Sequence, residues 1–164
     1  MKKLFAFLLF GFMFLGLSAQ EKSDLPNITL KNLDGESVNI ADLNNNGKPF
    51  IIAFWATWCS PGTKQFNAWS EVYDEWVEET GVKIFIVSID NERSSNKVGP
   101  MVTGRGWPFE VILDPKLEFN NAMNVSNTPH YFLFNGEGKI VFNKVGYIDE
   151  DEEELYDELI KIRK

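Results

Sequence analysis

The 164-residue sequence predicts a single α/β domain in which a central mixed sheet is flanked by helices. Two apolar runs, Phe50–Trp55 and 82–89, show no alternation of apolar and polar residues, which is typical of strands that are buried on both faces. A helical pattern lies between them and stops at Gly81. The last third of the chain combines a hairpin pattern with another helical one. Together these observations predict a sheet that is parallel in one half and antiparallel in the other.

The first half supplies an N-terminal hairpin and a βαβ unit. Residues 29–30 and 37–40 flank Asp34-Gly35, a turn signal, and are expected to form the hairpin. The helix after Cys59-Ser60-Pro61 connects the two buried strands, and such a crossover is right-handed with parallel strands. Its inner face repeats at spacings of three and four, in Phe66, Trp69, Tyr73, Trp76 and Val77.

The second half supplies the remaining elements. Residues 91–107 predict a poor helix broken near Gly99-Pro100, residues 110–113 a short strand, and residues 115–123 a helical segment. Strands at 131–134 and 139–142 are separated by residues 135–138, which have hairpin composition. A final helix over 150–162 is expected to bury Leu155, Leu159 and Ile162. This order is a thioredoxin-type arrangement, whereas a flavodoxin-like domain would need a further parallel strand in place of the hairpin.

The N-terminus has the pattern of a secretory signal peptide. Lys2 and Lys3 precede an apolar run over 4–17, and the small residues Ser18 and Ala19 follow it. The run is too short to cross a bilayer comfortably, although an uncleaved anchor is the alternative. We therefore expect a signal peptide at 1–20, a domain at 21–164, a periplasmic or secreted location, and no stable membrane anchor after cleavage.

The charge and the cysteine content narrow the function. After cleavage, 24 acidic and 14 basic residues remain, a net charge of −10. No basic stripe is present to neutralise phosphates, so nucleic acid is not expected as a partner. The single cysteine, Cys59, cannot form an internal disulfide and is an inert thiol, an intermolecular partner or a nucleophile. One cysteine and one histidine do not make a metal site, and no cofactor is expected.

Several segments carry a family resemblance. Residues 54–61 (Phe-Trp-Ala-Thr-Trp-Cys-Ser-Pro), Thr128-Pro129 before a strand, residues 136–139 and Gly146-Tyr147 resemble the TlpA-like branch of the thioredoxin superfamily. These redoxins are exported thiol–disulfide oxidoreductases related to the AhpC/TSA proteins. The resemblance implies that Cys59 is the catalytic thiol and that the partner is a disulfide-containing protein or a small-molecule thiol or disulfide. It also implies that Pro129 is cis, and that Trp58, Ser60, Pro61, Thr128 and Pro129 contact the substrate.

The chain departs from the family where the chemistry lies. The second cysteine of the family motif is replaced by Gly62, and a glutamate that the family often places three residues later is replaced by Gln65. Gln65 is a candidate auxiliary residue. His130, the only histidine, is the only side chain that could act as a base at neutral pH, although a lone histidine entering a strand is more often packed for structure.

Three functions remain open. In a monothiol oxidoreductase, a partly exposed Cys59 at the helix N-terminus would exchange disulfides, and an external thiol would resolve the adduct. In a one-cysteine peroxidase, Cys59 would become a sulfenic acid. Related peroxidases place a threonine three residues before the cysteine, where this chain has Ala56, with Thr57 one place late. A non-catalytic binding module is the third. The acidic run 149–154 could dock a basic partner or simply complement a helix dipole.

Overall fold

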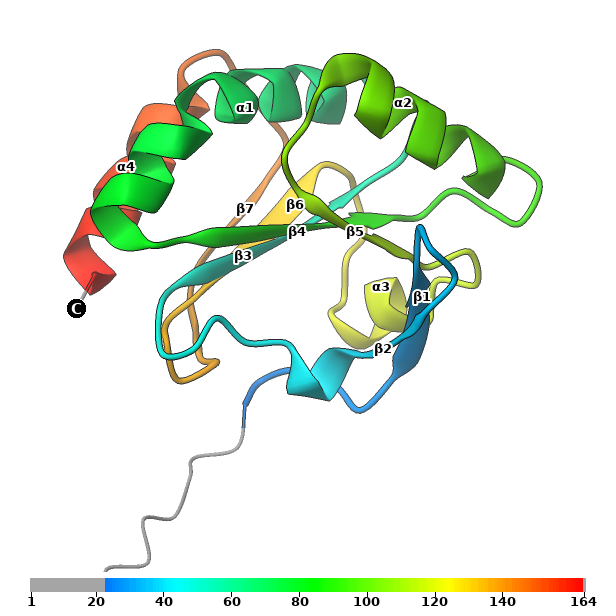
Figure 1. The fold of residues 1–164 in the computed structure, drawn as a ribbon, viewed down its shortest axis with the longest axis horizontal. Coiled ribbons are helices and arrows are strands. Elements are labelled where there is room, and N and C mark those ends of the chain that lie inside the picture. Colours follow the sequence, from blue (N-terminus) through cyan, green and yellow to red (C-terminus); the bar gives the residue numbers. More distant parts are fainter. Residues whose placement is uncertain (1–22, 164) are drawn as a thin grey trace, which may run out of the picture.

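The computed structural model describes residues 23–163, so the predicted signal peptide lies outside the described residues. Seven strands form one mixed sheet in the order β2-β1-β5-β4-β3-β6-β7 (Figure 1). The strands are β1 (Thr29–Asn32), β2 (Ser37–Asn39), β3 (Phe50–Trp55), β4 (Lys83–Ser88), β5 (Glu110–Leu113), β6 (His130–Phe134) and β7 (Ile140–Val145). The helices are α1 (Ser60–Thr80), α2 (Val98–Arg105), α3 (Glu118–Ala122) and α4 (Asp151–Ile162), with 3-10 turns η1 (Ile40–Asp42) and η2 (Ser95–Lys97).

The centre of the sheet confirms the predicted arrangement. Ala53 of β3 pairs with Ile86 of the parallel strand β4 on one side and with Tyr131 of the antiparallel strand β6 on the other. All six residues of β3 are buried, which explains why its sequence shows no alternation. The chain therefore forms a thioredoxin-like fold, with β1 and β2 added as an antiparallel pair beyond β5.

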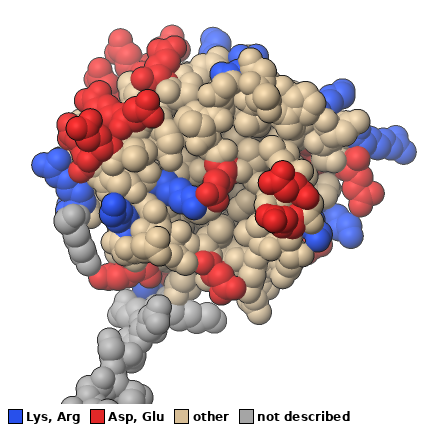
Figure 2. Space-filling model, viewed as in Figure 1, with Lys and Arg blue, Asp and Glu red and all other residues tan. Residues whose placement is uncertain are grey.

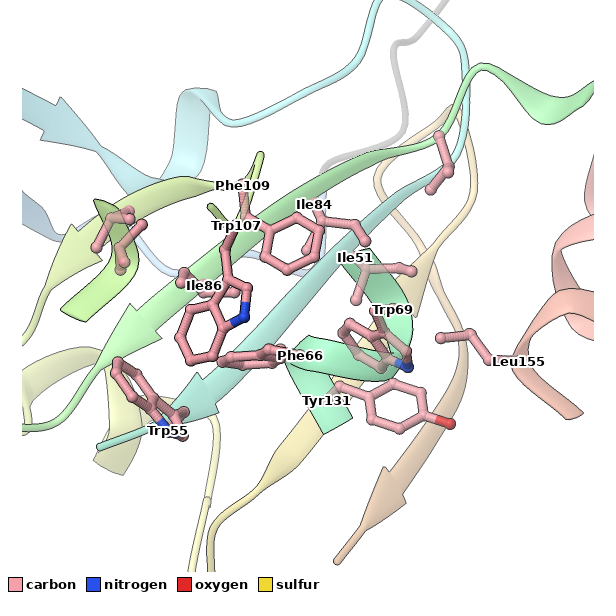
Figure 3. Close-up of a cluster of buried hydrophobic side chains, with 14 of the residues drawn as sticks. Ile51, Trp55, Phe66, Trp69, Ile84, Ile86, Trp107, Phe109, Tyr131 and Leu155 are labelled. Carbon is pink, nitrogen blue, oxygen red and sulfur yellow. The ribbon is translucent and has the colours of Figure 1, made fainter. Parts of the chain in front are cut away.

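Two apolar layers cover the sheet. Helices α1, α2 and α4 pack on one face, while α3 and η1 pack on the other (Figure 1). Figure 3 shows the α1 face, where the ring of Phe66 lies 5.7 Å from that of Trp55 and 5.2 Å from that of Trp107. Trp69 and Tyr131 make an edge contact further along the same layer, at 5.2 Å. Ring contacts of this kind fix the position of α1 over β3.

Two predicted helices differ from expectation. The segment 91–107 is not broken at Gly99-Pro100, because α2 begins at Val98 and places Pro100 in its first turn. Backbone N–H groups in a first helical turn have no partner within the helix, so proline is tolerated there. The helix expected over 115–123 is only α3, because Leu117 adopts a left-handed conformation with φ 61° that stops a helix from extending through it.

The acidic run 149–154 lies at the start of α4. Acidic side chains gather over this helix and the neighbouring part of α1 (Figure 2). Asp151 is buried, accepts a hydrogen bond from the Ile148 amide at 2.8 Å, and pairs with Lys144 of β7. Four carboxylates in the first turn of a helix complement its dipole, so the run has a structural reason to be acidic.

Candidate active site: a single thiol at the start of a helix

Cys59 is the N-cap residue of α1, as the sequence predicts. A tight turn connects it to β3, in which the Cys59 amide donates to the Ala56 carbonyl at 2.8 Å. The expectation of partial exposure is wrong, because Cys59 is only 4% exposed and packs into the α1-face core. The neighbouring Trp58 takes the outward position instead and is 68% exposed. The thiol therefore has little open surface around it.

In the first turn of α1, one backbone N–H group lies where a capping side chain such as that of Cys59 could accept its hydrogen bond. An N-cap side chain accepts from the N–H of the second or third helical residue. The second is Pro61, which has no N–H, and the third is Gly62. The Cys59 side chain makes no capping bond in the structure, so this donor stays available. A thiolate at Cys59 would gain both this hydrogen bond and the positive end of the helix dipole.

Gly62 lies where three parts of the site meet. A Cβ added there would be 2.5 Å from Cδ1 of Trp55, 3.2 Å from Sγ of Cys59 and 3.4 Å from Cβ of Pro129. Trp55 is fully buried, and its indole N–H points to the Thr63 hydroxyl at 3.4 Å. The indole therefore fills space that a side chain at position 62 would need. The sequence places Trp55 only at the end of a buried apolar run, and it gives no signal of this contact.

The loop before β6 brings a second backbone segment to the thiol. The Thr128-Pro129 peptide bond is cis, which confirms the prediction, and the Pro129 carbonyl accepts from the Gly146 amide at 2.7 Å. Beside this loop lies a groove of about 320 Å³ with no charged residue in its lining. Trp58 lines one part of it, and Leu117, Val125 and Thr128 line others.

The two auxiliary candidates lie in different places. His130 pairs in register with Phe54 and stacks on Phe132 at 4.3 Å, so it belongs to the α3 face, opposite the face that holds Cys59. Burial lowers the pKa of His130 from its ordinary value. Gln65 is fully buried on the inner side of α1, and neither its side-chain oxygen nor its nitrogen has a hydrogen-bond partner within the described residues. Ser60 and Pro61 are exposed at the start of α1. This placement does not support His130 as a base for Cys59.

Asp90 is a residue that the sequence analysis did not single out. It follows β4, is 1% exposed, and accepts hydrogen bonds from Thr57 and Ser88. The only signal in the sequence is its position, an acidic residue directly after a buried strand whose end lies beside that of β3. No group of three or more metal-ligating side chains occurs within residues 23–163, and no helix in that range is long and apolar enough to cross a bilayer.

The arrangement matches that of known proteins. The model of the AhpC/TSA family matches residues 22–143, most of the chain. The chain belongs to the AhpC/TSA family. An AhpC/TSA relative, the thiol-disulfide oxidoreductase ResA of Bacillus subtilis (strain 168), is 33% identical over 144 residues, which cover 88% of this chain and 78% of the relative.

Solved structures show the same redoxin fold. A thioredoxin-like protein from Porphyromonas gingivalis is 43% identical, with a TM-score of 0.78 over 86% of this chain and 92% of that one. StoA from Bacillus subtilis is 25% identical, with a TM-score of 0.62 over 80% of this chain and 99% of that one. The family resemblance inferred from residues 54–61 is therefore confirmed.

Proposed function

We propose that the protein is an exported monothiol member of this family that exchanges disulfides through Cys59. The observation that carries the proposal is the position of the only thiol. It lies at the N-cap of α1, and Gly62 lies between it and cis Pro129. Helix N-termini stabilise thiolates, and the thiolate is the nucleophile in disulfide exchange. The names of the relatives, thiol-disulfide oxidoreductases, support the same reaction class.

The reaction needs two exchange steps. The Cys59 thiolate attacks one sulfur of a client disulfide, a new S–S bond forms, and the other client sulfur leaves as a thiolate. A thiolate from solution then attacks the client sulfur of this mixed disulfide, which forms a second mixed disulfide and releases Cys59 as a thiolate. Position 62 has no sulfur, so this second step requires an external thiol.

The groove lined by Trp58 and Thr128, the neighbours of Cys59 and Pro129 in the sequence, favours a polypeptide client. No charged side chain lines it, and Trp58 and Leu117 expose apolar surface at its edges. A small anionic disulfide such as oxidised glutathione would find no cationic partner in this lining, and the domain carries a net charge of −10 beyond residue 20. An extended segment with an apolar side chain near its cysteine would instead bury that side chain against Trp58.

Two observations bear on the other functions. The Thr57 hydroxyl donates to Asp90 at 2.6 Å, so its hydrogen is not available to a peroxide, and this disfavours the one-cysteine peroxidase. The low exposure of Cys59 and the indole against Gly62 favour the binding module as the second candidate. Such a module would use the same groove without forming a covalent bond.

The test weighs the products of the mature protein by mass spectrometry. Residues 21–164 are incubated with a disulfide-linked apolar peptide, with oxidised glutathione, or with hydrogen peroxide, and Cys59→Ser is the control. We expect the mass of one peptide thiol to be added, slow release without added thiol, and a release rate that rises linearly with glutathione. Addition of one oxygen by peroxide, without a peptide adduct, would favour the peroxidase. Peptide binding without any adduct would favour the binding module.

A further inference from the structure

Asp90 holds the turn that carries the thiol. Its Oδ2 accepts from the Thr57 amide at 2.7 Å and its Oδ1 accepts from the Thr57 hydroxyl at 2.6 Å. A third bond comes from the Ser88 hydroxyl to Oδ2, at 2.9 Å. Thr57 is two residues before Cys59 and lies within the turn that the Cys59 amide closes onto Ala56. One carboxylate therefore fixes the backbone and the side chain of the same turn residue.

Asp90 is a buried carboxylate that is stabilised by hydrogen bonds and not by an ion pair. The side chain is buried, and none of the ion pairs formed within residues 23–163 involves it. A buried carboxylate is costly unless hydrogen bonds satisfy it, and charge-assisted bonds of this length are the strong ones. Within the part of the chain that the structure describes, the side-chain oxygens of Asp90 accept from Thr57 and Ser88 alone, so this carboxylate ties together the two segments that carry them. The ends of β3 and β4 are also joined directly, because the Ile89 amide donates to the Trp55 carbonyl at 2.8 Å.

The position of this turn sets where the sulfur lies, because Cys59 closes the turn that contains Thr57. Cys59 is nearly buried, and its neighbour Trp58 is exposed at the surface. The Cys59 sulfur lies close to Gly62, which in turn lies close to Pro129. A small rotation of residues 56–58 would shift the sulfur relative to the Gly62 N–H and close what little access remains. Misplacement of a reacting group by about 1 Å can lower a rate by about a hundredfold.

We propose that Asp90 is a positioning residue for Cys59, which holds the turn of residues 56–59 so that the sulfur stays reactive at the start of α1. The proposal rests on the thiol chemistry proposed above. It assigns no proton transfer to Asp90, which acts through Thr57 and not on the substrate. Because the carboxylate accepts from both donors of Thr57, neither is free to donate to a group bound to Cys59.

The test measures intrinsic thiol reactivity in the full mature domain. The probe is the neutral disulfide 4,4′-dithiodipyridine, and its second-order rate with Cys59 is recorded from pH 5 to 10 for the parent, Asp90→Asn and Thr57→Val. Asp114→Asn is the matched control, because Asp114 is also buried at the end of a strand and accepts two amides at 2.8 Å, but from Glu118 and Asn120 of α3. Thermal unfolding is followed for every variant.

We expect Asp90→Asn to lower the rate about ten- to a hundredfold at the pH where the thiol is fully ionised, and Thr57→Val to lower it less. Acrylamide quenching should show a changed environment of Trp58 in both. Asp114→Asn should lose stability but keep the parent rate. The inference is overturned if Asp90→Asn loses only stability, with an unchanged plateau rate and unchanged Trp58 quenching. A parent protein whose thiol does not react with the probe would instead contradict the proposed function itself.

Discussion

At the scale of single residues, the site is organised around Gly62, which has no side chain. Its neighbours are the sulfur of Cys59, the ring of Pro129 and the indole of Trp55. Glycine in a helix is less favourable than alanine by about 0.5–1 kcal/mol, so helix propensity alone would select against it. The Trp55 ring approaches position 62 so closely that a residue with a side chain would not fit there, which explains the glycine.

We expect Gly62→Ala to lower the free energy of unfolding by about 1–3 kcal/mol, because the new Cβ would lie 2.5 Å from Cδ1 of a buried ring. The matched control is Gly104→Ala in α2, where a Cβ meets nothing within 4 Å and should stabilise by about 0.5–1 kcal/mol. Urea unfolding measures both. A gain of stability in Gly62→Ala would show that the indole moves away freely.

Gly62→Cys tests the missing sulfur. The distance of 3.2 Å from Sγ of Cys59 to a Cβ at position 62 is near the value of about 3 Å that a disulfide requires. We expect the internal disulfide to form, and the reduced variant to release clients without external thiol. The indole of Trp55 must shift to admit the new side chain, so we expect the variant to be less stable than the parent. If the bridge forms and clients are released no faster than by the parent, Cys59 does not exchange disulfides with bound clients and the binding module is favoured.

At the scale of the elements, β6 separates two environments. Pro129, just before it, lies beside Gly62 in the site, while His130 lies on the α3 face beside Phe54 and Phe132. Successive residues of a strand point to opposite faces, so the histidine next to the site proline is directed away from the site. Because His130 follows Pro129 in the sequence, it was a candidate base for Cys59. The alternation of side chains along β6 places it on the opposite face of the sheet.

His130 should make stability depend on pH. Burial lowers its pKa, although the side chain of Asn143 opposes the shift, so the unfolded chain takes up the proton at higher pH than the folded one. This contribution is complete above the unfolded value of about 6.5 and is lost as the pH falls towards the folded pKa, at no more than about 1.4 kcal/mol per pH unit. We expect His130→Phe to flatten the stability profile between pH 7 and 5. Urea unfolding at each pH measures the profile, and the imidazole NMR signals of the only histidine give its folded pKa. Parallel profiles for parent and variant would contradict the expectation.

At the scale of the whole molecule, pattern and chemistry predicted the architecture, and tertiary packing decided the rest. The unbroken apolar run of β3 and the period of α1 gave the βαβ unit, because burial on both faces leaves a clear signal. Other features depend on contacts between segments that are distant in the sequence. These are the burial of Cys59, the packing of the Trp55 indole against Gly62, and the hydrogen bonds from Thr57 to Asp90. No local pattern contains that information.

The N-terminal segment packs against the turn between β6 and β7, which lies at the opposite end of β6 from the thiol. The Asp24 backbone amide donates to the Gly138 carbonyl, and Leu25 is buried. The Asp24 carboxylate accepts from the Ile140 amide and pairs with Lys139. We expect Asp24→Ala to lower the free energy of unfolding by about 1–2 kcal/mol, whereas Asp34→Ala in an exposed turn should change it by less than about 0.5 kcal/mol. Urea unfolding of both variants decides whether the domain needs this segment. Equal, small effects would place the start of the stable domain further along the chain.

The absence of a second sulfur at position 62 has a consequence for timing. In the proposed cycle, each captured client stays attached until a thiol from solution arrives, so the dwell time is the inverse of a rate that is proportional to the concentration of that thiol. The fraction of protein carrying a client would then rise when reductant is scarce and fall when it is plentiful. The fraction of a one-cysteine domain that is bound to clients would thus depend on the concentration of thiols in its compartment. A dithiol enzyme releases its client with its own second sulfur, so its release step does not depend on that concentration.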